Sequence, residues 1–207
     1  YIQCQLELVE QRLLIIGPNG IGKSTAINLL SGSFRPNLGE WENPSPEWEN
    51  VISTFPRGEL RDYLGLVAQG DIRIAVKPQY IDKLPKIFDG RVSDLLERVD
   101  DRGDMEELSE LLGISHIIGR DMSALSGGEL QRVAICATLL KQADVYFFDE
   151  PSSYLDIYER MRMVGVIREL SDKGKRVLVV EHDLAILDVL CDLIHVIYGE
   201  RSAYGIF

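Results

Sequence analysis

The nine residues Gly17 to Thr25 read Gly-Pro-Asn-Gly-Ile-Gly-Lys-Ser-Thr, and the rest of the chain is arranged around them. They match a phosphate-binding loop, in which Gly and four further residues precede Gly-Lys-Ser/Thr. Glycines let successive backbone N–H groups converge on phosphate oxygens, the lysine reaches the outer phosphates, and the serine hydroxyl can ligate Mg²⁺. The pattern predicts the following phosphate-contacting residues: Asn19, Gly20, Ile21, Gly22, Lys23, Ser24 and Thr25.

The flanks of this loop supply the context that a phosphate site needs. An apolar run at 13–16 predicts a buried strand before it, and the pattern at 26–30 predicts a helix after it. The start of that helix offers unpaired N–H groups and the positive end of its dipole to an anion. With strand and helix both present, a chance match in a Gly-rich turn is the weaker alternative.

Strand-like and helix-like patterns alternate along the chain. Strands are predicted at 2–8, 13–16, 72–76, 145–148, 177–180 and 194–198, and helices at 26–30, 92–113, 127–140, 157–170 and 184–190, with a helix–loop–helix at 47–68. This alternation predicts an α/β fold with a mostly parallel sheet flanked by helices.

Composition limits the possible functions. A net charge of −11 over 207 residues argues against a general nucleic-acid binder. Much of this negative charge lies in residues 97–110, and such an acidic segment is typical of a solvated helix face. Three widely spaced cysteines, Cys4, Cys136 and Cys191, suit a reducing cytosol and predict no iron–sulfur cluster in this chain. No apolar run approaches 18 residues, so the sequence predicts no membrane span.

Two carboxylates, Asp149 and Glu150, follow the apolar run 145–148. The end of a parallel strand lies at the carboxyl edge of the sheet, beside the phosphate loop. Asp149 is predicted to hold Mg²⁺, directly or through water, and Glu150 to act as general base on the attacking water. The alternative is a strand that ends in solvated acids.

A second anion-binding helix start is predicted at Leu-Ser-Gly-Gly-Glu, residues 125–129, where two glycines open a helix that a serine can cap. A capped helix without a ligand is the alternative. With this motif the chain resembles the nucleotide-binding domain of the ABC ATPase superfamily, whose signature is Leu-Ser-Gly-Gly. The resemblance implies a P-loop NTPase fold and a signature that closes in trans over a nucleotide held by a partner domain, through Ser126, Gly127, Gly128 and Glu129.

The resemblance assigns roles to further residues. Gln79 matches the Q-loop glutamine near Mg²⁺ and the attacking water, although one glutamine is also compatible with a surface loop. His182 matches the switch histidine that contacts the γ-phosphate, and Asp156 the D-loop residue at the seam between two domains. The implied catalytic residues are Glu150, His182 and Gln79. The implied ligands of Mg²⁺, which accompanies ATP as substrate, are Ser24, Gln79 and Asp149.

The amino-acid sequences of several motifs narrow the resemblance to one family within the superfamily. Ser-Ser-Tyr-Leu-Asp at 152–156, Lys-Pro-Gln-Tyr-Ile-Asp at 77–82 and the stretches 181–188 and 198–207 resemble the first nucleotide-binding domain of the ribosome-recycling, or RNase L inhibitor, family, with archaeal members closest. This implies an ATPase, weak as an isolated domain, in which closure of two such domains is coupled to splitting of ribosomal subunits.

The implied domain plan treats 1–207 as one ABC-type nucleotide-binding domain, with the insertion at 47–68 facing the ribosome and a helical signature subdomain at about 90–140. The implied partners are a second nucleotide-binding domain, either a missing half of the chain or a second copy, and the small ribosomal subunit in the cytoplasm, with no membrane. Family members also carry a ferredoxin-like domain that needs eight cysteines; the sequence leaves open whether this chain is a fragment of such a protein or complete.

Two other functions compete with this interpretation. An ABC transporter's ATPase subunit would dock on a membrane partner, but the sequence at 152–156 and the helix–loop–helix at 47–68 favour the recycling family. A nucleotide-dependent scaffold without catalysis would not require Lys23, Asp149, Glu150 and His182 to be intact.

Overall fold

A computed structural model describes residues 12–17, 20–38, 46–190, 193–196, 198–200 and 204–206. The strand expected at 2–8 lies outside these residues, as do Cys4, Asn19 and Cys191. Within the part of the chain that is described, no helix combines the length and apolar character required to cross a membrane.

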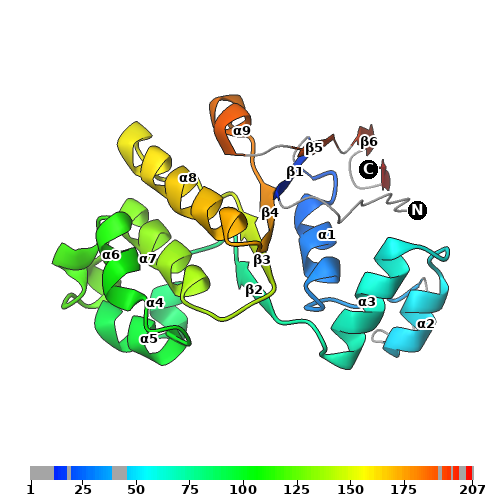
Figure 1. Cartoon of the computed structure of the whole chain (residues 1–207), viewed down its shortest axis with the longest axis horizontal. Helices are drawn as coiled ribbons and strands as arrows, with labels where there is room; N and C mark the ends of the chain where they lie inside the picture. Colours follow the sequence, from blue (N-terminus) through cyan, green and yellow to red (C-terminus); the bar gives the residue numbers. More distant parts are fainter. Residues whose placement is uncertain are drawn as a thin grey trace.

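A five-stranded sheet lies at the centre of the molecule (Figure 1). Its strands, in the spatial order β2-β3-β4-β1-β5, are β1 (Arg12–Ile16), β2 (Ile74–Lys77), β3 (Val145–Asp149), β4 (Arg176–Val180) and β5 (Leu193–Val196). All four pairings are parallel. The predicted parallel sheet flanked by helices is confirmed, because the apolar runs form strands that are covered on both faces.

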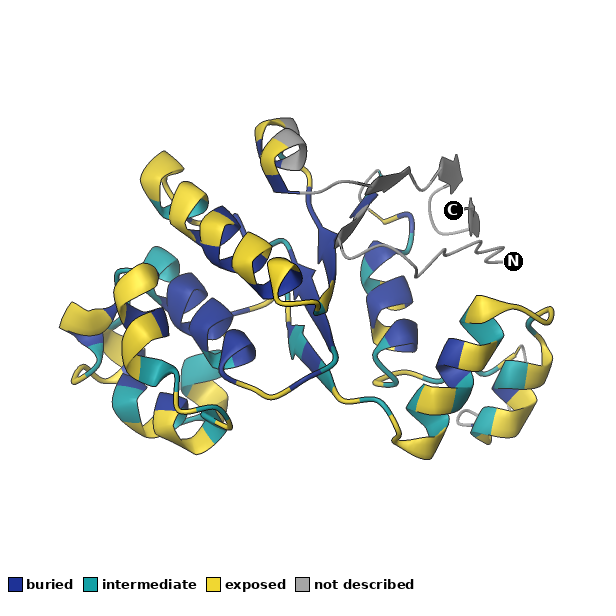
Figure 2. Ribbon diagram, in the orientation of Figure 1, coloured by how far each residue is buried: buried dark blue, intermediate teal, exposed yellow. Residues whose placement is uncertain are grey.

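Alternate residues of β3 belong to two separate cores. Val145 and Phe147 join the cluster that includes residues of α1 (Lys23–Leu30), whereas Tyr146 and Phe148 join the cluster beneath α7 (Gly127–Leu139) and α8 (Ile157–Asp172). Figure 2 shows β3, most of β4 and the inner faces of α1 and α7 as buried. The sheet thus separates two hydrophobic layers, and the candidate site residues Asp149 and Glu150 lie at its carboxyl edge.

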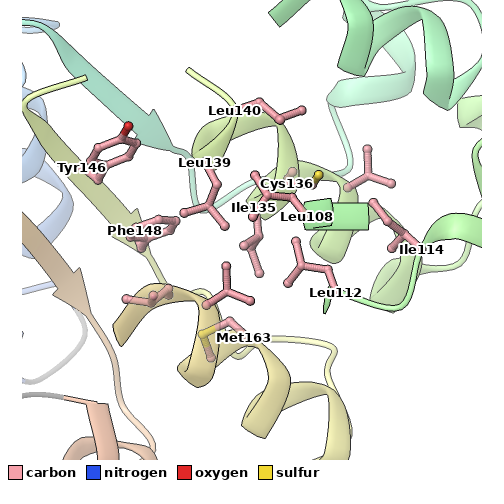
Figure 3. Close-up of a cluster of buried hydrophobic side chains, with 14 of the residues drawn as sticks. Leu108, Leu112, Ile114, Ile135, Cys136, Leu139, Leu140, Tyr146, Phe148 and Met163 are labelled. Carbon is pink, nitrogen blue, oxygen red and sulfur yellow. The ribbon is translucent and has the colours of Figure 1, made fainter. Parts of the chain in front are cut away.

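The larger core extends from the sheet into a group of helices. It joins α7 and α8 to α6 (Met105–Leu111), and Figure 3 shows side chains from these elements meeting β3. The labelled residues are Leu108, Leu112, Ile114, Ile135, Cys136, Leu139, Leu140, Tyr146, Phe148 and Met163. This packing holds α7, which begins with the signature motif, against the sheet.

The prediction of one helix over 92–113 is wrong. The segment forms α5 (Val92–Val99) and α6, separated by a loop. The Asp100 carboxylate accepts hydrogen bonds from the backbone N–H groups of Arg102, Gly103 and Asp104, at 3.2, 2.8 and 3.2 Å. Such side-chain bonds compete with helical ones and end the first helix. A short helix, α4 (Leu84–Ile87), and two 3₁₀ turns, Ser115–Ile117 and Met122–Ala124, were not predicted.

The predicted strand at 194–198 is also too long. Strand β5 ends at Val196, and β6 (Tyr198–Glu200) pairs in antiparallel fashion with β7 (Tyr204–Ile206). The apolar run 194–198 carries no signal of this break, because apolar residues suit both the buried strand and the hairpin. Helix α9 (Leu184–Leu190) precedes β5 with the bounds that the sequence predicts.

The predicted helix–loop–helix consists of α2 (Trp48–Ser53) and α3 (Glu59–Gln69), and the break at 56–58 is confirmed. The two helices lie on the side of α1 that faces away from the helical group around α7 (Figure 1). The buried hydroxyl of Tyr63 donates a 2.9 Å hydrogen bond to the carbonyl of Leu30 at the end of α1. The helix pair α2–α3 is therefore fixed to the helix that follows the phosphate loop.

Substituting Tyr63 with phenylalanine is expected to lower the free energy of unfolding by about 1–2 kcal/mol, because the Leu30 carbonyl loses a buried donor. Urea unfolding measures this. Tyr158→Phe is the matched control, since Tyr158 is 80% exposed. Equal unfolding midpoints for the two variants would mean that the hydrogen bond contributes nothing.

Candidate nucleotide site

The phosphate loop joins β1 to α1 and has the backbone that an anion cradle needs. Gly20 and Gly22 have φ of 81° and 108°, and a Cβ at either position would meet no atom of the described residues within 4 Å. Glycine is therefore required by the left-handed backbone and not by crowding. Helix α1 begins at Lys23, and its N-cap residue, Gly22, has no side chain that could cap it, so this end of the helix suits an anion.

Lys23 is held in place across its own loop. It is only 6% exposed, and its Nζ donates a 2.7 Å hydrogen bond to the carbonyl of Gly17. Burial lowers the pKa of Lys23 below its ordinary value, whereas the charges of Glu150 and Asp149 raise it. The ammonium group is thus positioned beside both carboxylates before any ligand arrives.

Asp149 has the features of a magnesium ligand. It is 5% exposed, and its Oδ1 has no hydrogen-bond partner in the described part of the chain. Burial raises the pKa of this carboxyl group, and a hydrogen bond from the Ser24 side chain lowers it. A buried carboxylate oxygen without a partner requires an explanation, and carboxylate and hydroxyl oxygens are hard ligands that suit Mg²⁺. Ser24 and Asp149 therefore fit this ion.

Glu150 brings the predicted catalytic residues together. Its Oε1 accepts a 2.9 Å hydrogen bond from Nε2 of Gln79, 71 residues earlier in the chain, and lies 3.1 Å from Nε2 of His182. These contacts argue against a strand that simply ends in solvated acids. Gln79 as a direct magnesium ligand stays a prediction, because its amide nitrogen here contacts Glu150.

Sequence reasoning missed two buried side chains next to Glu150. Lys77, at the end of β2, donates from Nζ to the carbonyls of Asp149 and Glu150, at 2.9 and 3.4 Å. Gln131, on α7, donates from Nε2 to the carbonyls of Glu150 and Pro151, at 2.9 and 2.8 Å. Burial lowers the pKa of Lys77 to about 8, against the raising effect of the charges of Asp149, Glu181 and Glu150. The sequence did carry a signal for Lys77, because a lysine at the end of an apolar strand is unusual enough to indicate a specific role.

Glu181 is a further residue that the sequence did not single out. Its buried carboxylate accepts hydrogen bonds from the backbone N–H of Ser152, at 2.7 Å, and of His182, at 3.0 Å. The residue therefore ties the end of β4 to the turn that follows β3. This places His182 beside Glu150 at the edge of the sheet.

The signature motif forms the capped helix start that the sequence predicts. Ser126 and Glu129 make a reciprocal capping box, and the hydrogen bonds from Ser126 lower the pKa of Glu129. A Cβ on Gly127 would lie 3.1 Å from the Tyr154 ring, and one on Gly128 would lie 2.9 Å from the Tyr154 carbonyl oxygen. The Tyr154 carbonyl belongs to the backbone and cannot move aside as a side chain can, so position 128 needs glycine.

Asp156 caps α8. Its Oδ1 accepts a 2.9 Å hydrogen bond from the backbone N–H of Glu159, whose own carboxylate bonds to the N–H of Asp156. Glu159 also forms a 3.0 Å ion pair with Arg132 of α7. The loop that carries Asp156 is thereby connected to the signature helix, and its position at a seam between domains stays a prediction.

Comparison with known proteins agrees with this geometry. The sequence model of the ABC transporter family matches residues 5–153. The chain belongs to the ABC transporter family. A manganese transport system ATP-binding protein of Bacillus subtilis is 32% identical over 207 residues, covering 97% of this chain and 78% of that protein. A bacterial Atm1-family ABC exporter, at 22% identity and a TM-score of 0.64, shares the fold.

Other members of the family are more similar. The chain is 49% identical to an uncharacterized ABC transporter ATP-binding protein of Methanocaldococcus jannaschii and 46% identical to translation initiation factor RLI1 of Chaetomium thermophilum. These alignments cover 93% of this chain but 31% and 32% of those proteins, so the chain spans about a third of their length.

Solved structures give the same result. Archaeal ribosome recycling factor aABCE1, in complex with ribosomal stalk protein aP1, and a structure named RNase-L Inhibitor each superpose with a TM-score of 0.90 at 51% identity. Each match covers 95% of this chain and 38% of the other. The resemblance to the RNase L inhibitor family is confirmed, and these identities favour it over a transporter subunit.

Proposed function

We propose that this chain is an ATP-binding and ATP-hydrolysing domain of a ribosome-recycling ABC ATPase. The observation that carries the proposal is the convergence of Gln79 and His182 on the carboxylate of Glu150, one residue after the buried Asp149. Lys23 and Ser24 at the start of α1 complete the group. Positioned charges of this kind account for most of the catalysis in phosphoryl transfer.

The residues divide the work of hydrolysis. Lys23 and the first N–H groups of α1 would bind the outer phosphates, while Ser24 and Asp149 would hold Mg²⁺, which would offset charge on the phosphate oxygens. Glu150 takes the proton as a water oxygen bonds to the γ-phosphorus and the bond from phosphorus to the ADP oxygen breaks. The amide of Gln79 and the imidazole of His182 orient the carboxylate for this transfer.

The proposal includes a second nucleotide-binding domain. Ser126, Gly127, Gly128 and Glu129 would contact a γ-phosphate bound to that partner, and Asp156 would line the seam. The isolated domain 1–207 would then bind ATP but turn over slowly, because half of each phosphate clamp is supplied in trans. The boundaries of the insertion, 47–68, and of the signature subdomain, about 90–140, are part of the same proposal.

The ribosome is the proposed client, in the cytoplasm. Relatives bear the names translation initiation factor RLI1 and archaeal ribosome recycling factor, and one structure is described as ribosome-bound archaeal Pelota and ABCE1. The insertion α2–α3 presents the exposed Arg57 and the partly exposed Arg61. On an acidic chain, such local cations are suited to contact rRNA phosphates.

Co-sedimentation of the full-length protein with small ribosomal subunits tests this. Binding is expected to require ATP and to weaken about tenfold in Arg57→Glu, since a charge-assisted phosphate contact is lost. Lys86→Glu is the matched control, because it reverses one exposed charge outside the insertion. If co-sedimentation neither requires ATP nor weakens in Arg57→Glu, the ribosome is rejected as the client, and the transporter alternative becomes the favoured function.

A further inference from the structure

Glu150 has an uncommon backbone conformation. Its φ is +47°, in the left-handed region that residues other than glycine rarely occupy. Such a conformation persists only where neighbouring groups enforce it, and it is found mainly at functional sites. On one side the N–H of Glu150 is fixed by a 2.8 Å hydrogen bond to the carbonyl of Val180.

On the other side, two buried donors from different elements hold three successive carbonyl groups. Lys77 of β2 binds those of residues 149 and 150, and Gln131 of α7 binds those of residues 150 and 151. The Glu150 carbonyl is shared between them. Both donors contact the backbone of the turn, and the carboxylate of Glu150 is left to Gln79 and His182.

The chemical types of these donors point to the same role. Lys77 and Gln131 are each 0% exposed, and burying an amine or amide is unfavourable unless it is hydrogen-bonded. An ammonium group has three donors and can bridge successive carbonyls, which an apolar strand residue cannot. The Oε1 of Gln131 has no partner in the described part of the chain, so only the NH₂ end of this amide is used.

We propose that Lys77, assisted by Gln131, is a positioning residue for ATP hydrolysis that fixes the left-handed turn and so aims Glu150 at the attacking water. The inference rests on the proposed ATPase function. Without either donor, the peptide groups around Glu150 can rotate and its carboxylate moves relative to Lys23 and Asp149. A displacement of about 1 Å in such a site costs on the order of 10²-fold in rate.

The test compares Lys77→Met, Gln131→Met and wild type in the full-length protein at saturating MgATP. Methionine has a similar length and no donor. Turnover is expected to fall about 10²-fold in Lys77→Met and about tenfold in Gln131→Met, with the Kd for MgATP changed less than about threefold, because the lost interaction matters in the transition state only. Lys141→Met, which removes an exposed lysine, is expected to match wild type.

A second readout separates positioning from simple support of the fold. In the background of Glu150→Gln, Lys77→Met is expected to cause no further loss, because residues that act as a unit are not additive. An equal fold-loss in both backgrounds, or wild-type turnover in the single variants, would overturn the proposal. If Lys77→Met does not fold, Gln131→Met in the two backgrounds decides the question. A wild-type protein that neither binds nor hydrolyses MgATP would instead reject the proposed function.

Discussion

Replacing Glu150 with glutamine is expected to lower ATP turnover by about 10²- to 10⁴-fold, the span usual for the loss of a general base. The amide keeps the size of the carboxylate but cannot accept the proton of the attacking water. Lys23, Ser24 and Asp149 are untouched, so MgATP binding is expected to remain. Phosphate release measures the first quantity and equilibrium dialysis with labelled ATP the second.

The control for this substitution is Glu110→Gln, which neutralises an exposed acid in α6 and is expected to hydrolyse ATP like wild type. Turnover in Glu150→Gln that equals that of the control would remove Glu150 from its role. Loss of MgATP binding in Glu150→Gln would show instead that the carboxylate acts in holding the nucleotide.

Lys23→Ala is expected to weaken MgATP binding about 10²-fold, since hydrogen bonds to charged groups contribute about 1.5–3 kcal/mol and each 1.4 kcal/mol is tenfold in affinity. The effect is large because this cation is nearly buried beside the phosphate loop. Equilibrium dialysis measures the Kd, and Lys86→Ala, which removes an exposed lysine of α4, is the control.

Lys23 also bonds to Gly17, so its removal could act through stability. The thermal midpoint without nucleotide, compared between Lys23→Ala and wild type, separates the two effects. An affinity loss with an unchanged midpoint supports a direct phosphate contact. Unchanged affinity in Lys23→Ala would exclude that contact.

The parts of the site that sequence alone predicted are those with local signals. The phosphate loop is one continuous stretch, and its glycine spacing encodes the backbone directly. Asp149 and Glu150 were predicted because the end of a parallel strand always lies at the same edge of the sheet. The family resemblance assigned Gln79, Glu150 and His182 to the surroundings of the attacking water and the γ-phosphate, but it did not predict that Gln79 and His182 contact the Glu150 carboxylate.

Lys77 and Gln131 were missed because their contacts depend on packing between elements. Lys77 reaches Glu150 only because β2 pairs with β3 in the register that places it opposite Phe148. Gln131 lies on a helix whose buried face is otherwise mostly apolar, so no local pattern shows which carbonyl it binds. The break between α5 and α6 was missed for a similar reason, since apolar periodicity continues across a loop that the Asp100 side chain creates.

Isothermal titration of MgATP into the purified wild-type domain 1–207 tests the central claim most directly. The structure predicts saturable binding of one nucleotide by this domain, weakened when magnesium is withheld because Ser24 and Asp149 would then have no ion to hold. Absence of any binding heat from wild-type protein, indistinguishable from the Lys23→Ala titration, would contradict the assignment of residues 17–25 as a nucleotide site.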